Sequence, residues 1–255
     1  MTDRLPPTSP PPGPAELPFN TLGSDRGMVW LKAGLAEVQS NPGIWIAIAA
    51  IYGIGCLVIG LIPLIGALAI ALGTPIVIGG IMMGCRSRAE GGMMKIEHLW
   101  VAFNGPWQQL LIVGLILLGI AFVVGLIVGS IVAALMFGAL SRGAGPGMGI
   151  FFIAGLIQLL VTVPILVFVC FSPPLVAIRG LDAVGALKNG FKASLANIVP
   201  LAIMIAGIAV PVFIINVILS SASLALIPVA GLVGGAAMMI GCASLYAAFR
   251  DVYGG

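Results

Sequence analysis

The sequence predicts an all-α, polytopic membrane protein with six transmembrane helices in three repeats, each an amphipathic helix followed by a helical hairpin. Three observations predict this fold class. Of the 255 residues, 60% are hydrophobic and only 7% are charged, whereas soluble domains have about 25% charged residues. Long blocks of the chain contain no charged residue, and two distant segments align with each other.

The charge-free blocks set the number of membrane crossings. A helix needs about 20 apolar residues to cross a hydrocarbon core about 30 Å thick. The blocks between Glu37 and Arg86 and between Lys192 and Arg250 are each long enough for two helices, and the blocks on either side of Arg142 for one each. The predicted transmembrane helices cover residues 43–62, 64–85, 108–138, 149–172, 198–220 and 224–248.

The N-terminal segment, residues 1–24, is rich in proline and begins MTDRLPPTSPPPGPAELPFN. Proline at this density favours extended, unpacked conformations, so we predict a disordered cytoplasmic tail before a transmembrane domain at 25–255. The segment lacks the apolar stretch and small-residue cleavage site of a signal peptide.

Basic residues predict the orientation. With six crossings, both termini and the loops at 86–107 and 179–197 share one side, which holds ten of the eleven Lys and Arg residues. By the positive-inside rule this side is cytoplasmic, so we expect a multi-pass protein of the bacterial inner membrane with both termini in the cytoplasm. All eight acidic residues lie there too, leaving a net charge of +2. That mild excess suits anionic lipid headgroups and not nucleic acid.

A short segment with apolar residues at helical spacing precedes each hairpin. Nearby lysines make each segment a candidate amphipathic helix in the membrane interface. The three sets are Met28, Leu31, Leu35 and Val38; Ile96, Leu99, Trp100 and Phe103; and Val184, Leu187, Phe191 and Leu195.

The repeats are visible in two alignments. LKAGLAEVQSNPGIWIAI from Leu31 aligns with LKNGFKASLANIVPLAIM from Leu187, and GIMMGC ending at Cys85 with AMMIGC ending at Cys242. In this frame LIPLIG at 61–66 and LIPVAG at 226–231 are equivalent hairpin tips on the non-cytoplasmic side. There proline ends one helix and glycine permits the turn into the next.

Several stretches carry a family resemblance: LIPLIGALAIALGTPIVIGGIMMGCRSRAEGG, the following HLWVAF, and FSPPLVAIRGLDAVGALKNGFKASLANIVP. Over about residues 27–253 the chain resembles an uncharacterised bacterial family of six-helix inner-membrane proteins, a domain of unknown function. It is more distantly similar to the membrane domain of glycerophosphodiester phosphodiesterases. The resemblance implies fold and membrane location, and it supplies no catalytic residues.

Residues suited to chemistry are scarce. The predicted spans contain no ionisable Asp, Glu, Lys, Arg or His, which argues against proton-coupled transport and acid–base catalysis within the bilayer. The single histidine, His98, and four cysteines without a CxxC pair form no metal or redox motif. We therefore predict no catalytic, cofactor-binding or metal-binding residues.

Two sets of polar residues are candidates for binding. RSRAEGG at 86–92 and the lysines of the amphipathic segments are candidate contacts for lipid headgroups, the alternative being that they anchor helix ends. Polar residues within the spans either bond between helices or line a polar cavity. The first set is Arg86, Arg88, Lys95, Lys188 and Lys192, and the second is Thr74, Gln158, Thr162 and Asn216.

Small residues recur every four positions on three predicted helices. Such stripes let helix backbones approach closely, either within one chain or against a second copy. The stripes are Ala121, Gly125, Gly129 and Ala133; Gly80 and Gly84; and Gly231 and Gly235.

Together these features predict a non-enzymatic scaffold or accessory protein of the cell envelope. Its expected partners are membrane lipids, in particular anionic ones, and a second copy or another membrane protein. The alternative is a channel or carrier for a small neutral or amphiphilic solute that uses the helices interrupted by proline. An enzyme acting on lipid is a third, less favoured class.

Overall fold

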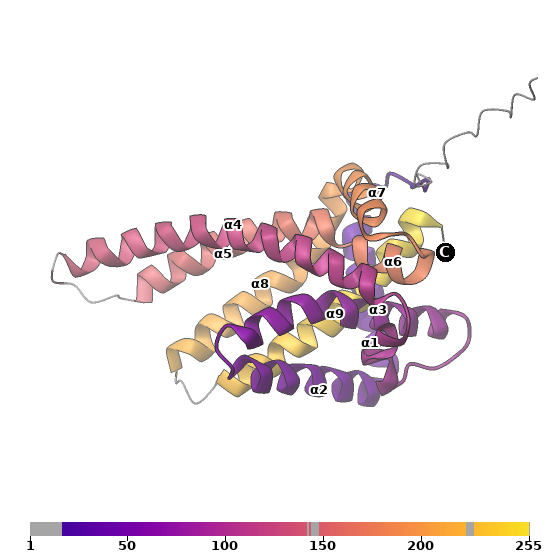
Figure 1. The fold of residues 1–255 in the computed structure, drawn as a ribbon, viewed down its shortest axis with the longest axis horizontal. Coiled ribbons are helices and arrows are strands. Elements are labelled where there is room, and N and C mark those ends of the chain that lie inside the picture. Colours follow the sequence, from indigo (N-terminus) through magenta and orange to yellow (C-terminus); the bar gives the residue numbers. More distant parts are fainter. Residues whose placement is uncertain (1–16, 142, 144–147, 223–226, 255) are drawn as a thin grey trace, which may run out of the picture.

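The computed structural model describes residues 17–141, 143, 148–222 and 227–254, and every regular element in these ranges is helical. Within them, six helices are long and apolar enough to cross a membrane. This agrees with the prediction of an all-α, multi-pass membrane protein. The elements are α1 Arg26–Ser40, α2 Pro42–Gly60, α3 Ile65–Ala89, η1 Ile96–Leu99, η2 Val101–Asn104, α4 Trp107–Leu140, α5 Met148–Val169, α6 Ser172–Arg179, α7 Ala183–Ala196, α8 Ile198–Ala222 and α9 Ile227–Tyr253 (Figure 1).

The predicted spans differ from the helices mainly at their charged ends. Helix α3 continues to Ala89 and α9 to Tyr253, beyond the predicted ends at 85 and 248. The arginines there lie in the last helical turn, where the helix dipole favours positive charge. The predicted span 149–172 corresponds to α5, Met148–Val169, and Pro173 and Pro174 lie in the first turn of the next helix, α6.

Three hairpins point the same way. In Figure 1 the α2–α3 turn, the far ends of α4 and α5, and the far ends of α8 and α9 all lie toward the left, while α6, α7 and the C-terminus lie at the opposite end. The segments that join one hairpin to the next are thus gathered at that opposite end.

The core lies where α1, α2 and α8 pack on α9, with α3, α6 and α7 beside them. Its largest fully buried side chains include Trp30 from α1, Trp45 and Ile48 from α2, and Phe171 before α6. Burying a large apolar side chain contributes about 1.5–3 kcal/mol. The α1 helix is therefore an integral part of the packed body.

The α4–α5 hairpin is different, because few of its residues are buried. Near the start of α4, Leu110 and Val113 are buried, and α4 lies against α3 there. Beyond this point α5 contacts α8, with the Phe152 and Phe213 ring centroids 6.0 Å apart, whereas Phe122 and Phe137 of α4 are 66% and 74% exposed. The 34 residues of α4 give it a length of roughly 50 Å, well above the thickness of a hydrocarbon core.

The LIPLIG tip does connect α2 to α3, but not in the way the sequence predicts. The residue with positive φ is Leu64 (φ 63°, ψ −58°), and the amide of Ile65 donates to the carbonyl of Pro63 at 2.7 Å. These features define a γ-turn. Gly66 is needed for space, since a Cβ there would lie 1.9 Å from the Ile59 carbonyl oxygen. The LIPVAG tip lies partly outside the described residues.

Two of the three predicted amphipathic segments have another form or packing. On α1, Leu31 is buried but Met28 is 48% exposed. The helix docks on α8 and α9 through Gly27, Trp30 and Gly34, because the glycines allow close approach.

The second predicted segment forms the two 3₁₀ helices η1 and η2 instead of one amphipathic helix. The segment is short and is followed by Gly105 and Pro106, which disfavour its continuation as a longer α-helix. Leu99 is buried in it, whereas Trp100 and Phe103 are about half exposed.

Candidate functional site: the charged end

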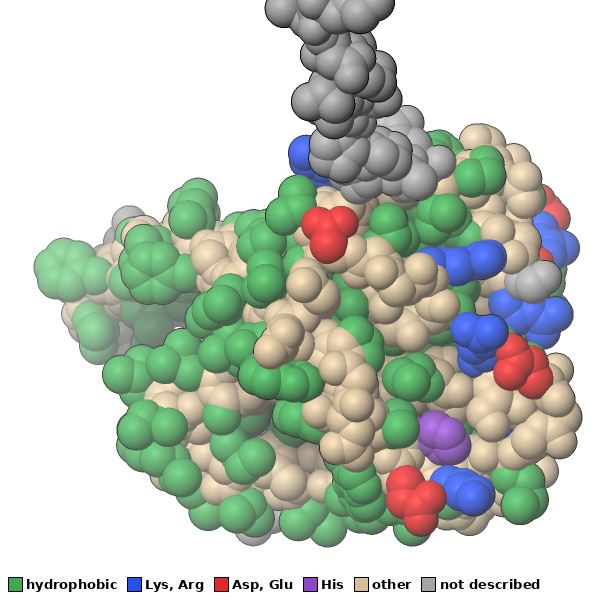
Figure 2. All heavy atoms as spheres, turned by 45° about the vertical axis from the view of Figure 1, so that its right-hand side comes forward, with side chains coloured by type: hydrophobic (Ala, Val, Ile, Leu, Met, Phe, Trp, Pro, Cys, Tyr) green, Lys and Arg blue, Asp and Glu red, His purple; other side chains and the backbone are tan. Residues whose placement is uncertain are grey.

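Charged side chains gather at one end of the molecule (Figure 2). They come from α1, the end of α3, the segment before η1, the α6–α7 region and the end of α9. We call this part the charged end. Its described basic residues are Arg26, Lys32, Arg86, Arg88, Lys95, Arg179, Lys188, Lys192 and Arg250, and its described acidic residues are Asp25, Glu37, Glu90, Glu97, Asp182 and Asp251.

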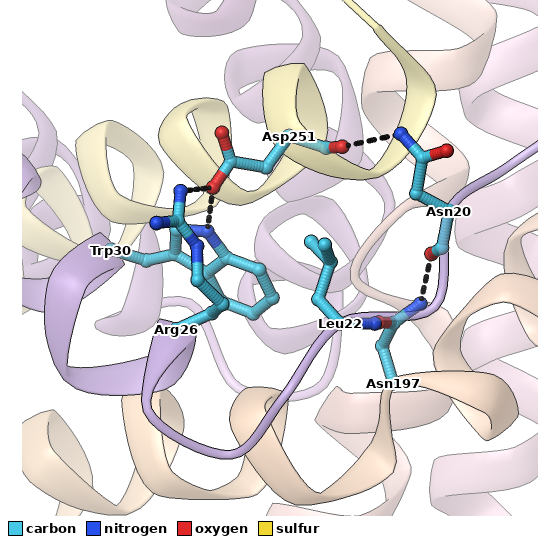
Figure 3. Close-up of polar contacts among 6 residues, drawn as sticks. All are labelled: Asn20, Leu22, Arg26, Trp30, Asn197 and Asp251. Carbon is cyan, nitrogen blue, oxygen red and sulfur yellow. Dashed lines mark hydrogen bonds and ion pairs between the residues drawn. The ribbon is translucent and has the colours of Figure 1, made fainter.

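Asp251 near the end of α9 holds α1 in place (Figure 3). One carboxylate oxygen accepts from the Trp30 indole nitrogen at 2.6 Å and also pairs with the Arg26 guanidinium. The hydrogen bond and charge of Asp251 raise the pKa of Arg26. Because the Trp30 ring is buried, this carboxylate supplies the acceptor that its N–H group would otherwise lack.

Residues 17–25 form an N-terminal strap across the charged end. The Asn20 side chain donates to the Asp251 carbonyl at 3.0 Å, and the Asn197 amide donates to the Asn20 carbonyl at 2.9 Å. The Asn197 amide oxygen accepts from Leu22 N at 2.9 Å (Figure 3). The strap therefore joins α9 to the α7–α8 junction.

The strap corrects the predicted boundary of the disordered tail. That tail was expected to reach residue 24, but Leu17, Phe19 and Leu22 pack against the core. These spaced apolar side chains indicate a packed segment, although the high proline content of the tail favours disorder. The remainder of the predicted tail, residues 1–16, lies outside the described residues.

Arg88 contacts two residues of α1. It forms an ion pair with Glu37 of α1 and donates to the Ser40 hydroxyl at 2.6 Å. The pair links the end of α3 to α1. Of the two arginines in RSRAEGG, Arg88 thus has a structural role.

Arg86 lies in a hollow of about 400 Å³ at the charged end. The ends of α3, α6 and α9 form its walls, and no local sequence pattern groups them because they are far apart in the chain. The lining residues are Arg86, Ala89, Glu90, Ile178, Arg179, Tyr246, Phe249 and Arg250. Arg179 and Arg250 are functional candidates that sequence reasoning missed.

Helix α7 packs on the core mainly through small and polar residues. Its buried positions are small or polar: Ala183, Gly185, Ala186, Asn189, Gly190, Ala193 and Ser194. Three residues of its predicted apolar stripe point outward, Val184, Phe191 and Leu195, which are 48%, 48% and 52% exposed. The fourth, Leu187, packs against the core. Lys188 and Lys192 are exposed on the same helix. The helix thus presents an apolar stripe flanked by lysines to its surroundings.

Lys95, the remaining predicted headgroup contact, is exposed before η1. Its main-chain amide donates to Nδ1 of His98 at 3.0 Å, so the histidine caps the short helix. The five predicted headgroup residues therefore occupy three parts of the charged end: Arg86 and Arg88 on α3, Lys95 before η1, and Lys188 and Lys192 on α7.

The polar residues predicted within the spans lie on three helices, α3, α5 and α8. Thr74 lies between α2 and α3, bonding the Tyr52 hydroxyl at 3.2 Å and the Ile70 carbonyl at 2.6 Å. Asn216 donates to the Val212 carbonyl on α8 at 2.9 Å, and Gln158 lies on α5. The side chain of Thr162 lies outside the described ones. Of these bonds, the one between Thr74 and Tyr52 joins two helices, and the one from Asn216 lies within α8.

No protein-family model, curated protein or solved structure matches this chain. Among the residues that the structure describes, no group of three or more His, Cys, Asp or Glu side chains is placed to hold a metal ion.

Proposed function

We propose that this chain is a non-enzymatic, multi-pass protein of the bacterial inner membrane that serves as a scaffold or accessory protein through lipid or protein partners. The observation that carries the proposal is the outward apolar stripe of α7 at the charged end.

The position of α7 supports contact with the membrane interface. It follows Arg179, where one candidate span ends, and precedes Ile198, where the next begins. A helix at this level that exposes large apolar side chains beside lysines can bury the apolar stripe among lipid chains. The lysine ammonium groups can then reach anionic headgroups.

The proposed orientation has both termini in the cytoplasm. It is supported by the excess of basic residues in the connecting segments and by their gathering at one end of the molecule (Figure 2).

The proposal also includes three hairpin repeats, supported by like roles at aligned positions of α1 and α7. Asn41 and Asn197 are the C-caps of these helices. Gly34 lies close to a serine, Ser244, and Gly190 likewise lies close to Ser172. Aligned glycines that admit a neighbouring helix are expected if both units descend from one ancestral unit.

Photo-crosslinking in native membranes tests the proposal. A benzophenone amino acid replaces Phe191, and the control carries it at Phe171, which is fully buried. We expect the probe at Phe191 to crosslink lipid or one defined partner protein, and the probe at Phe171 to crosslink only within the chain. Mass spectrometry of the adducts identifies the partner.

A folded protein whose probe at Phe191 captures neither lipid nor a reproducible protein would contradict the proposal. Equal lipid labelling at Phe171 would also contradict it, because α7 would then have no distinct outward face.

A further inference from the structure

The hollow at the ends of α3, α6 and α9 has the composition of an anion site. We propose that it binds a phosphate group at the level of the lipid headgroups, with Arg250 as the principal ligand. This inference rests on the proposed function and deepens it, because it names one site and the chemistry of its ligand.

The charges in the hollow are unbalanced. It contains the guanidinium groups of Arg86, Arg179 and Arg250 but a single carboxylate, Glu90. Arg86 pairs with Glu90 at 2.8 Å. The lining therefore keeps a net charge of +2, which a doubly charged phosphate monoester would neutralise.

Arg179 is held in place by contacts that, among the described residues, include no carboxylate. It donates to the main-chain carbonyls of Tyr253 at 3.0 Å and Gly254 at 2.5 Å. Its guanidinium carbon also lies 5.9 Å from the centre of the Phe249 ring. These contacts fix a charged wall at the end of α9, so a ligand would meet an arginine that is already ordered.

Arg250 differs from the other two arginines. Within the described part of the chain it makes no hydrogen bond or ion pair, and its side chain is exposed. A guanidinium presents several N–H donors in a plane that matches two phosphate oxygens. Because its donors are not used by the protein, Arg250 is expected to supply most of the affinity.

The position of the hollow, at the ends of three candidate spans, points to a membrane headgroup. Arg86 and Arg250 lie near the ends of the candidate spans Ile65–Ala89 and Val229–Tyr253, and Arg179 ends a third. Ile178, Tyr246 and Phe249 give the hollow an apolar side. A phosphate attached to a glycerol and acyl chains suits this mixture better than inorganic phosphate, although both share the charged group.

Native mass spectrometry of the full-length protein tests the site. The protein is reconstituted in nanodiscs of phosphatidylcholine with a minor fraction of phosphatidic acid, and retained lipid is counted for wild type, Arg250→Gln and Arg250→Lys. Losing charge-assisted bonds of about 1.5–3 kcal/mol corresponds to at least about a tenfold loss of affinity. We expect that loss for Arg250→Gln and a smaller one for Arg250→Lys.

Lys32→Gln is the matched control, because it removes one exposed positive charge from the same end on α1. It should leave retention within about twofold of wild type. An equal loss in Lys32→Gln, or full retention in a folded Arg250→Gln variant, would overturn the assignment of the hollow.

A second arm separates the sources of phosphate. Glycerol 3-phosphate and inorganic phosphate are titrated into the detergent-solubilised protein, and thermal unfolding is followed. Stronger stabilisation by phosphatidic acid than by either soluble probe supports a lipid ligand. Stronger stabilisation by a soluble probe supports the phosphate site but overturns its assignment to lipid.

The same data distinguish the two proposals. Anionic lipid retained equally by wild type and Arg250→Gln would overturn the hollow and leave the proposed lipid partner in place. Wild type that retains no phosphatidic acid and responds to no soluble phosphate would overturn the hollow, and the crosslinks at Phe191 would then decide the proposed function alone.

Discussion

Small residues line two regions of this protein and have opposite surroundings. Where α2 meets α9, the helices are in close contact. A Cβ on Gly235 would lie 2.5 Å from the Ala49 carbonyl oxygen, and one on Gly231 would lie 2.9 Å from a Leu57 methyl carbon. This α2–α9 seam therefore depends on glycine for its geometry.

The outer half of α4 carries the same kind of pattern, but no helix lies opposite it. A Cβ on Gly125 or Gly129 would meet no atom within 4 Å, and Ala121 and Ala133 are exposed. In Figure 1 this part of α4 lies at the far end of the α4–α5 hairpin. Its stripe is open in the single chain.

The comparison shows what a stripe of small residues predicts and what it does not. A glycine every four residues makes close approach sterically permitted, but the approaching helix must be supplied by the topology. The α2–α9 contact joins segments almost 200 positions apart in the sequence. Local pattern alone contains no information on that pairing.

The largest expected effect comes from filling the α2–α9 seam. Gly235→Ala puts a methyl group against the Ala49 main chain, and a backbone carbonyl cannot rotate away as a side chain can. Overpacking of this kind costs about 1–3 kcal/mol, and we expect the upper part of that range. Unfolding by SDS in mixed micelles measures the change.

Gly234→Ala is the matched control, because Gly234 is the neighbouring residue of the same helix and its Cβ would meet no atom within 4 Å. Equal destabilisation of the two variants would contradict the seam and remove the contrast with α4.

The next effect is expected at Asp251, which fixes α1 on the same packed body. Asp251→Ala removes the acceptor of the buried Trp30 N–H group and the partner of Arg26. Leaving a buried donor unpaired costs about 1–3 kcal/mol. The exposure of Arg26 places the expected loss at about 1–2 kcal/mol, measured by thermal unfolding in detergent.

Glu97→Ala serves as the control, since Glu97 is an exposed acidic residue of the charged end. Were the two variants equally stable, the docking of α1 would not depend on the Asp251 carboxylate.

Much of the fold could be predicted from the sequence, because membrane spans are long local patterns. The charge-free blocks located six helices, and mainly the ends of these helices differed. The turn at Leu64 could not be predicted, because a positive φ at leucine is intrinsically unfavourable and persists only where the two flanking helices impose it.

The candidate site was predicted less well, for a physical reason. Arg88 was expected at lipid headgroups but is paired with Glu37, a contact between α3 and α1 that exists only after folding. Arg179 and Arg250 line one hollow that likewise forms only after folding. On α7 most of the spaced apolar residues face outward, as expected for an amphipathic helix in the membrane interface. Helix α1 has a similar spacing, but it docks on the protein through its glycines and Trp30.

A smaller effect, of opposite sign, is expected at the tip of the packed α2–α3 hairpin. Leu64→Gly replaces a residue with φ 63° by one that adopts positive φ freely. After the entropy that glycine gains in the unfolded chain is subtracted, we expect a gain of about 1 kcal/mol. SDS titration measures it.

Leu61→Gly is the comparison, because Leu61 is also exposed at this tip but has helical φ of −67°. It should be slightly destabilising, and a gain in both variants would mean that flexibility of the tip, not strain at Leu64, was responsible.

The smallest effect is expected in the open stripe of α4. Gly129→Ala adds a methyl group that meets no atom within 4 Å in the single chain, and alanine favours a helix over glycine by roughly 0.5–1 kcal/mol. We therefore expect the variant to be about 0.5 kcal/mol more stable than wild type in SDS titration at low protein concentration. If it is less stable, and the loss grows with protein concentration, then α4 packs against a second copy. Both stripes would then allow close helix packing, the α2–α9 stripe within the chain and the α4 stripe between chains.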